Sequence, residues 1–273
     1  MKRLVLFAMA LAAVCIMPSC GKDPKPSDEP SIEPTAEMIV FGNHTYMDVV
    51  TYNHVDWEYH ENDYSSYYWK DFDINGDGEF DFALCSRKMK SSYQGDIQGL
   101  DTLYDVTLHA APRMEFHSDL QTNEIYSHPD STIIPTDSIP LIYIEITESC
   151  NKVLESDVYK GPYSKYVIQS HYKNDLLNMN DSIFRPLFTP YTLYVSNYQT
   201  PYYIDLDDYH PNVFKSNIDG REGCFNLPMN EEIYIGFKYN DESRYRLGWI
   251  KIIIEQKTNG FVFVTLLETA IQQ

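Results

Sequence analysis

The stretch LIYIEIT, residues 141–147, decides the fold class of this chain. Its three isoleucines alternate with tyrosine, glutamate and threonine. Because successive side chains of a β-strand point to opposite faces, this spacing gives one apolar face and one solvated face. The pattern favours antiparallel sheets that pack face to face over parallel sheets, whose strands are apolar on both faces.

Nine further segments are short and rich in aromatic and β-branched residues, which suit a half-buried pleated surface. They are residues 46–52, 67–74, 80–87, 102–110, 163–169, 191–197, 231–239, 245–255 and 261–268. Residues 175–180 would form at most one helical turn, and the long connections at 118–140 and 198–228 are expected to be surface loops. The prediction is an all-β fold with few or no helices, a single antiparallel β-sandwich of the jelly-roll or lectin-like type over residues 38–273.

The composition is strongly acidic, which limits the partners. The 273 residues include 40 Asp and Glu against 21 Lys and Arg, a formal net charge of −19. This balance argues against nucleic acid as a partner, because binding to phosphates needs a basic surface that displaces counterions. With 43 % hydrophobic and 14 % aromatic residues, the chain also has too much apolar surface to be a disordered acidic protein.

The N-terminal residues 1–19 are predicted to be a lipoprotein signal peptide. Two basic residues precede an apolar run at residues 4–17, which is too short to span a bilayer. The run ends before a Ser-Cys-Gly sequence that resembles a bacterial lipobox, so Cys20 is the expected site of lipid attachment. The alternative is an ordinary cleaved secretory signal in which Cys20 plays no part. Residues 20–37, rich in proline and acidic side chains, are expected to form an extended tether.

The sequence after Cys20 resembles that of Bacteroidetes lipoproteins, in which acidic residues behind the lipidated cysteine act as a surface-export signal. Asp23, Asp28 and Glu29 occupy such positions here. The resemblance implies an outer membrane lipoprotein that faces outward at the cell surface, and a lipoprotein that faces the periplasm is the alternative. In either case the chain would contact the membrane through its N-terminal lipid only.

The strongest chemical motif is DINGDGEFD at residues 73–81. Carboxylate and amide oxygens at alternate positions can fold inward around a hard cation, and Ca²⁺ accepts six to eight oxygens. The candidate ligands are the side chains of Asp73, Asn75, Asp77 and Asp81 and the backbone carbonyl of Glu79. Leu84 stands where an EF-hand needs its twelfth-position glutamate, and both flanks alternate like strands. The motif therefore predicts a hairpin with a structural calcium ion; the alternative is an acidic turn that binds nothing specific.

Two segments resemble uncharacterised secreted β-sandwich proteins of bacteria, including Bacteroidetes surface lipoproteins. The first is the DxNxDGxxDF hairpin at residues 73–82. The second is the IGFKY strand at residues 235–239, followed by GWI at 248–250. The resemblance implies a β-sandwich fold and a location at the cell surface, and it assigns no activity.

A tyrosine-rich segment is the weaker candidate for ligand binding. Aromatic rings stack on the C–H faces of sugars, and carboxylates accept hydrogen bonds from sugar hydroxyls. The candidate residues are Tyr191, Tyr194, Tyr202, Tyr203 and Asp205. Tyrosine also suits strands and interfaces in general, so a structural role is the alternative. His, Asp and Glu alternate at residues 54–60. We expect this run to be a solvated strand face, and the alternative is a transition-metal site.

The sequence favours a lipid-anchored binding protein over an enzyme. Nucleophile-elbow, zincin and phosphate-loop motifs do not occur in the chain. The sharper hypothesis is capture of a polysaccharide, and the alternative is an adhesion or structural role through contacts with a surface protein. A glycoside hydrolase is a third hypothesis, which would need two carboxyl groups about 5–10 Å apart in a deep cleft.

Overall fold

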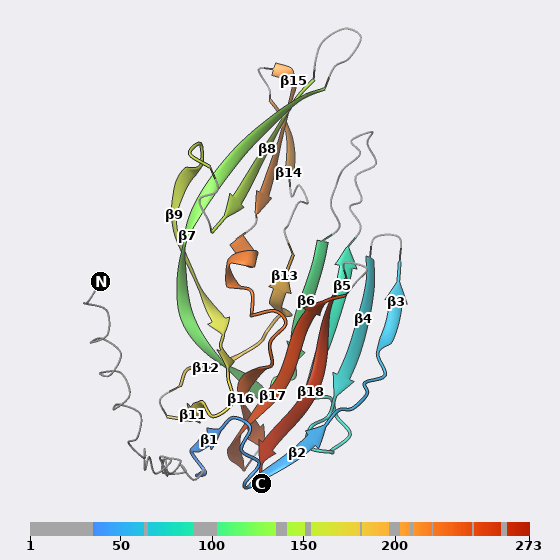
Figure 1. The fold of residues 1–273 in the computed structure, drawn as a ribbon, viewed down its shortest axis with the longest axis vertical. Coiled ribbons are helices and arrows are strands. Elements are labelled where there is room, and N and C mark those ends of the chain that lie inside the picture. Colours follow the sequence, from blue (N-terminus) through green and yellow to red (C-terminus); the bar gives the residue numbers. More distant parts are fainter. Residues whose placement is uncertain are drawn as a thin grey trace, which may run out of the picture. The chain divides into compact units, whose positions relative to one another are not determined.

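The fold is shown in Figure 1, which is drawn from a computed structural model. The structure describes residues 35–62, 65–89, 103–134, 141–150, 154–180, 182–196, 203–207, 210–219, 221–241, 243–257 and 261–273. Residues 34–273 form one compact unit. The expected signal peptide, Cys20 and nearly all of the expected tether lie outside the described residues.

One of the two main sheets has five antiparallel strands. Their order is β13 (Tyr191–Val195), β6 (Leu103–Ala110), β5 (Phe82–Met89), β4 (Ser65–Phe72) and β3 (Glu58–Glu61). Alternate side chains of β5 and β6, such as Phe82, Leu84 and Leu108, are fully buried on the inner face. The outer face therefore carries the other half of each strand, including Trp69 and Cys85.

The second main sheet follows the order β14, β15, β8, β7, β16, β17, β18 and β2, with β9 and β12 also paired to β7 and β10 paired to β16. The strands are β2 (Met47–Thr51), β7 (Met114–Ile134), β8 (Leu141–Ser149), β9 (Val158–Ile168), β10 (Ser170–His171), β12 (Phe184–Pro186), β14 (Tyr203–Asp207), β15 (His210–Asp219), β16 (Ile233–Asp241), β17 (Arg244–Gln256) and β18 (Val262–Gln272). Only β15 and β8 pair in parallel among the described strands, which the long chain segment between them permits.

Two hydrophobic cores lie on opposite faces of β16, β17 and β18. The larger core joins the five-stranded sheet to side chains such as Ile235, Phe237 and Ile250. The smaller core contains Trp249 and Tyr234, and it is covered by a two-stranded ribbon of β1 (Met38–Val40) and β11 (Leu176–Asn178). Residues 247–250 of β17 are therefore buried on both faces, and Figure 1 shows β17 and β18 (red) in front of β5 and β6.

The all-β, sandwich-like prediction is confirmed, and each of the ten expected segments contains a strand. Three local predictions were wrong. The expected loop at 118–140 is largely strand β7, the expected loop at 198–228 contains β14 and β15, and 175–180 contains strand β11. The only helical element among the described residues is a 3₁₀ turn, η1 (Arg221–Phe225). Within the described part of the chain there is no helix long and apolar enough to cross a membrane.

A half-buried pair of histidines connects the sheet to the N-terminal ribbon. His117 Nδ1 lies 2.7 Å from His171 Nε2, and the His171 ring stacks on Phe41 with centroids 4.5 Å apart. This hydrogen bond needs one nitrogen with a proton and one without, so both rings are not charged together. Burial, and then the neighbouring His117, lower the pKa of His171 to about 4, although Asp175 opposes the shift.

Acidification is expected to destabilise the fold through His171. Its folded-state pKa lies below the unfolded value of 6.5, so the unfolded chain binds the proton more tightly and stability falls as pH drops from 6.5 towards 4. The expected loss from this group between pH 7 and pH 5 is about 2 kcal/mol. Urea unfolding at both pH values measures it in the native chain and in His171→Gln. An equal pH dependence in the two chains would contradict the assignment to His171.

Candidate functional site

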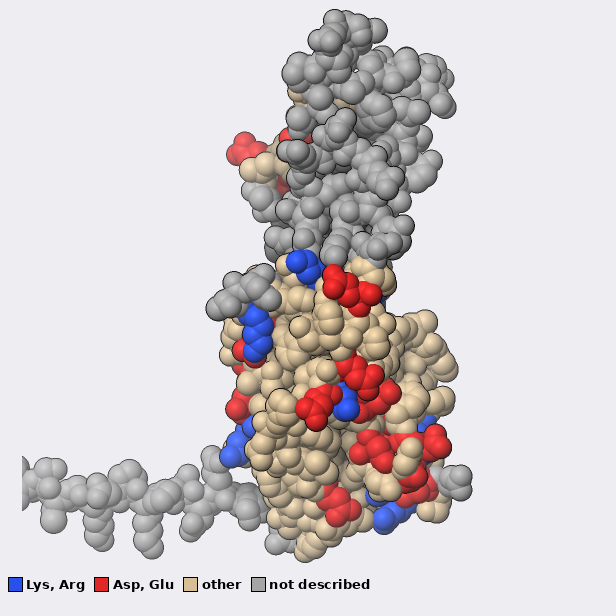
Figure 2. Space-filling model, turned by 90° about the vertical axis from the view of Figure 1, so that its right-hand side faces the viewer, with Lys and Arg blue, Asp and Glu red and all other residues tan. Residues whose placement is uncertain are grey.

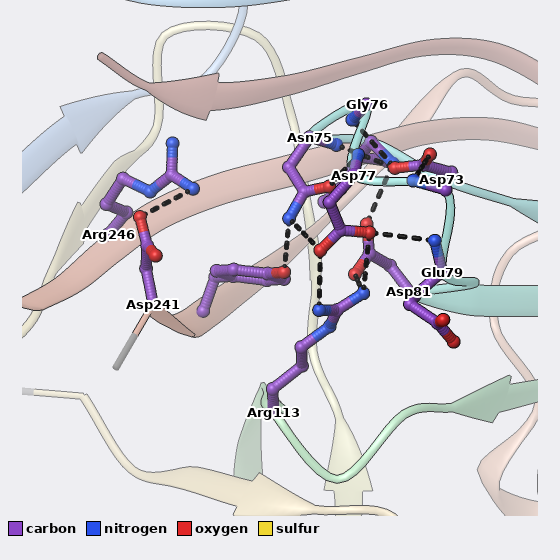
Figure 3. Close-up of polar contacts among 12 residues, drawn as sticks. Asp73, Asn75, Gly76, Asp77, Glu79, Asp81, Arg113, Asp241 and Arg246 are labelled. Carbon is purple, nitrogen blue, oxygen red and sulfur yellow. Dashed lines mark hydrogen bonds and ion pairs between the residues drawn. The ribbon is translucent and has the colours of Figure 1, made fainter. Parts of the chain in front are cut away.

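The loop that joins β4 to β5 folds its acidic side chains over its own backbone (Figure 3). Oxygens of Asp73 accept backbone N–H groups from Asn75, Gly76 and Gly78 at 3.3, 2.7 and 2.8 Å. Gly76 and Gly78 have φ angles of 75° and 89°, a region that glycine adopts without strain. Glycine at these positions thus allows the tight turn that brings the N–H groups to one carboxylate.

Arg113, which lies just before β7, supplies a positive charge to this loop. Its Nη1 donates to Asp77 Oδ2 at 2.7 Å, and its Nη2 lies 2.8 Å from Asp81 Oδ1. Asp81 is fully buried, and its Oδ2 accepts the backbone N–H of Ile74 at 2.8 Å. A single guanidinium therefore bridges one exposed and one buried carboxylate, which ties the hairpin to the start of β7.

The two carboxylates respond to this environment in opposite ways. Hydrogen bonds from Arg113, followed by those from Asn75 and the Glu79 backbone, lower the pKa of Asp77 to about 2. Burial raises the pKa of Asp81, against the opposing effects of the Ile74 N–H and of Arg113. Asp81 thus depends on its hydrogen bond and its ion pair to remain ionised inside the domain.

Tyr239 forms the inner wall of the loop. Its hydroxyl accepts a hydrogen bond from Asn75 Nδ2 at 2.6 Å, and its ring lies 5.4 Å from the guanidinium carbons of both Arg113 and Arg246. Burial raises the pKa of this phenol well above its usual value. The ring is almost fully buried, so the loop is held against β16 rather than projecting into solvent.

The structure gives the expected calcium ligands a different set of partners. Asp73 accepts three backbone N–H groups, Asn75 points its amide nitrogen towards Asp77, and Arg113 occupies Asp77 and Asp81. Glu79 donates its backbone N–H to Asp77 Oδ1 at 2.8 Å. Among the described residues, no three His, Cys, Asp or Glu side chains are grouped as a metal site. A calcium ion at this loop would need Arg113 to leave Asp77 and Asp81.

A separate groove lies on the outer face of the five-stranded sheet. It encloses about 530 Å³ and is lined by Glu58, His60, Tyr67, Trp69, Cys85, Arg87, Thr107, His109 and Pro190. The middle strand, β5, contributes Cys85, whose small side chain is 6 % exposed. Trp69 on β4 and His109 on β6 lie on the two strands beside it and line the same hollow.

Aromatic rings form much of the groove wall. Trp69 meets His109 edge-on with centroids 4.5 Å apart, and its indole N–H donates to Asp71 at 2.8 Å. On the neighbouring strand pair, His60 stacks on Tyr67 with centroids 4.9 Å apart. These cross-strand contacts fix the orientation of the rings before any ligand arrives.

Polar groups of the groove sit beside these rings. Arg87 Nε donates to both carboxylate oxygens of Asp105, at 3.1 and 3.2 Å, directly across from it on β6. Burial lowers the pKa of His109, which favours its neutral form. Burial raises the pKa of the Cys85 thiol to about 11, so this sulfur remains protonated at neutral pH.

The described tyrosines that the sequence singled out lie on strands of two different sheets. Tyr191 and Tyr194 lie on β13 and pack against the larger core, and the Tyr191 hydroxyl accepts the backbone N–H of Ile168 at 3.0 Å. Tyr203 and Asp205 lie on β14 in the other main sheet. Tyr202 is outside the described residues.

Sequence reasoning passed over most of the groove. Glu58 and His60 were part of the alternating run at 54–60, and the structure places both in the groove wall. Their partners Trp69, Cys85 and Thr107 come from three other strands, with no local motif that marks them. Strand alternation was the available signal, because it separates the outward side chains of each strand from the buried ones.

Neither the distribution of surface charge nor comparison with known proteins indicates a binding partner. On the face seen in Figure 2, the Lys and Arg side chains of the described residues are scattered among Asp and Glu. Comparison of the chain with protein-family models, with curated proteins and with solved structures finds no match. The acidic hairpin loop and the groove are therefore the two features of the chain on which a function can be based.

Proposed function

We propose that this protein is a lipid-anchored cell-surface protein that binds saccharides in the groove of the five-stranded sheet. The observation that carries the proposal is the pairing of rigid aromatic rings with polar groups in one concave surface. Trp69 and Tyr67 can cover the apolar C–H faces of a bound saccharide, and Thr107 and Glu58, at different points along the groove, can exchange hydrogen bonds with hydroxyls of different sugar units. Ordered rings reduce the entropy lost on binding.

Replacing Trp69 is expected to weaken this binding. Trp69→Ala removes the largest ring of the groove and should lower affinity at least about tenfold, which corresponds to about 1.4 kcal/mol. The measurement is a glycan array, followed by calorimetric titration with the polysaccharides that bind. Tyr245→Ala is the matched control, because this exposed aromatic lies on β17 outside the groove and its loss should leave binding unchanged.

Two outcomes would speak against the proposal. If Trp69→Ala bound the same polysaccharides as the native chain with unchanged affinity, the binding site would lie elsewhere on the chain. No binding of the native chain to any polysaccharide would favour contacts with a surface protein instead. Exposed apolar side chains on the antiparallel pair of β7 and β9 support that second candidate, since Leu120 lies directly opposite Tyr166 and both are exposed.

The calcium hairpin and the anchor belong to the same proposal. A structural calcium ion would hold the β4–β5 hairpin, with Asp73, Asp77 and Asp81 as its carboxylate ligands and Asn75 and Glu79 as further oxygen donors. Support comes from the inward-folded side chains of the loop, and the competing cation is Arg113.

Lipid at Cys20 would place the groove outside the cell, where polysaccharides occur.

A further inference from the structure

The groove runs across the strands rather than along them. In the register of the sheet, Glu58 of β3 is opposite Trp69 of β4, Trp69 is opposite Cys85 of β5, and Cys85 is opposite Thr107 of β6. Pro190 continues the groove immediately before β13. Neighbouring strands lie about 4.8 Å apart, so Glu58 and Thr107 are separated by about 14 Å and the full width is about 19 Å.

The charge of the groove is not basic. Arg87 is neutralised by Asp105, and Glu58 adds a negative charge at the β3 edge. The whole chain is also strongly acidic. A uronic or sulfated sugar would therefore enter against an unfavourable potential, whereas hydroxyl groups can use the carboxylate and the threonine directly.

We propose that the groove takes a neutral oligosaccharide of about three to four units laid across β3 to β6, and not a single sugar. This proposal rests on the saccharide binding proposed above. A pyranose ring is about as wide as one strand spacing, so one sugar covers Trp69 but cannot also reach Glu58 and Pro190. The central sugars would stack on the rings of β4, while the outer ones reach Glu58 on β3 and Pro190 beside β13.

The length of the oligosaccharide is the variable that tests the proposal. The probes are oligosaccharides of one to six units from glucan, mannan, xylan and galactan, with oligogalacturonides of the same lengths as the acidic comparison. Calorimetric titration should show affinity that rises by at least about tenfold from one to four units of a neutral series and then levels off. Oligogalacturonides should bind more weakly than the neutral series at every length.

Variants at the two ends of the groove make the test specific to position. Pro190→Ala should weaken binding of four units by about fivefold and leave two units unchanged, because Pro190 lies about three strand spacings from Trp69. Glu58→Ala and Trp69→Ala should weaken both lengths, because the two residues are direct partners on neighbouring strands. Glu61→Ala is the matched control for Glu58→Ala, because Glu61 is on the same strand with its side chain on the opposite face.

The possible failures are distinguishable. Equal affinity for one and four units, or a preference for oligogalacturonides, would overturn this inference and leave saccharide binding standing. Absence of binding to all of the probes would overturn both.

Discussion

Gly248→Ala is expected to lower the free energy of unfolding by about 3 kcal/mol. A Cβ atom at this position would lie 2.3 Å from Cζ of Phe237 and 2.4 Å from the carbonyl oxygen of Ala270. Both distances are far below van der Waals contact, and the second involves the backbone of β18, which cannot rotate away as a side chain can. Residues 247–250 of β17 are buried on both faces, so a shift of the strand that relieved the clash on one face would disturb the packing on the other.

Gly223→Ala provides the control for this prediction. Its added Cβ would meet nothing closer than 3.9 Å, so we expect a change within about 0.5 kcal/mol. Urea unfolding of the three chains, followed by tryptophan fluorescence, measures the difference. Adding Phe237→Leu to Gly248→Ala should recover part of the loss by removing one of the two close contacts. A Gly248→Ala chain as stable as the Gly223→Ala chain would show that the strands can separate at little cost.

The fold class was predictable because burial on one face leaves an alternating pattern in the sequence. The isoleucines of 141–147 gave the strand β8 correctly. Strand β7 did not follow this rule, because its antiparallel pairing with β9 leaves apolar side chains such as Leu120 and Tyr166 exposed among polar ones. Backbone pairing with four other strands holds β7 in place, and backbone pairing leaves no signature in side-chain types.

The candidate site was predictable only where its residues are close in sequence. The nine residues of the hairpin loop could be read as a unit, but Arg113 lies 36 residues from Asp77 and has no motif. The groove depends on the register of four strands, which brings Glu58, Trp69 and Thr107 into one row. Tyrosine content alone does not locate a site, since a ring such as that of Tyr191 packs against the core as readily as it faces a ligand.

Arg113→Met is expected to destabilise the domain by about 3 kcal/mol at pH 7, because it leaves the buried Asp81 carboxylate without its cation. Burial already raises the pKa of Asp81, and without Arg113 the folded-state pKa should lie further above the unfolded value. A raised carboxyl pKa costs stability as pH rises, so the deficit should shrink when the pH is lowered towards 4. Urea unfolding at pH 7 and pH 4.5 measures both effects.

Calcium should stabilise the Arg113→Met chain more than the native chain, because the substitution leaves Asp77 and Asp81 available to a metal ion. Thermal melting at millimolar calcium measures the shift, and Arg185→Met, whose guanidinium stacks on Tyr166, is the control for loss of an arginine. Equal shifts in the native and Arg113→Met chains would show that calcium and Arg113 do not compete for the same carboxylates. Unchanged melting in both chains would overturn the calcium proposal and leave Arg113 as the cation of the hairpin.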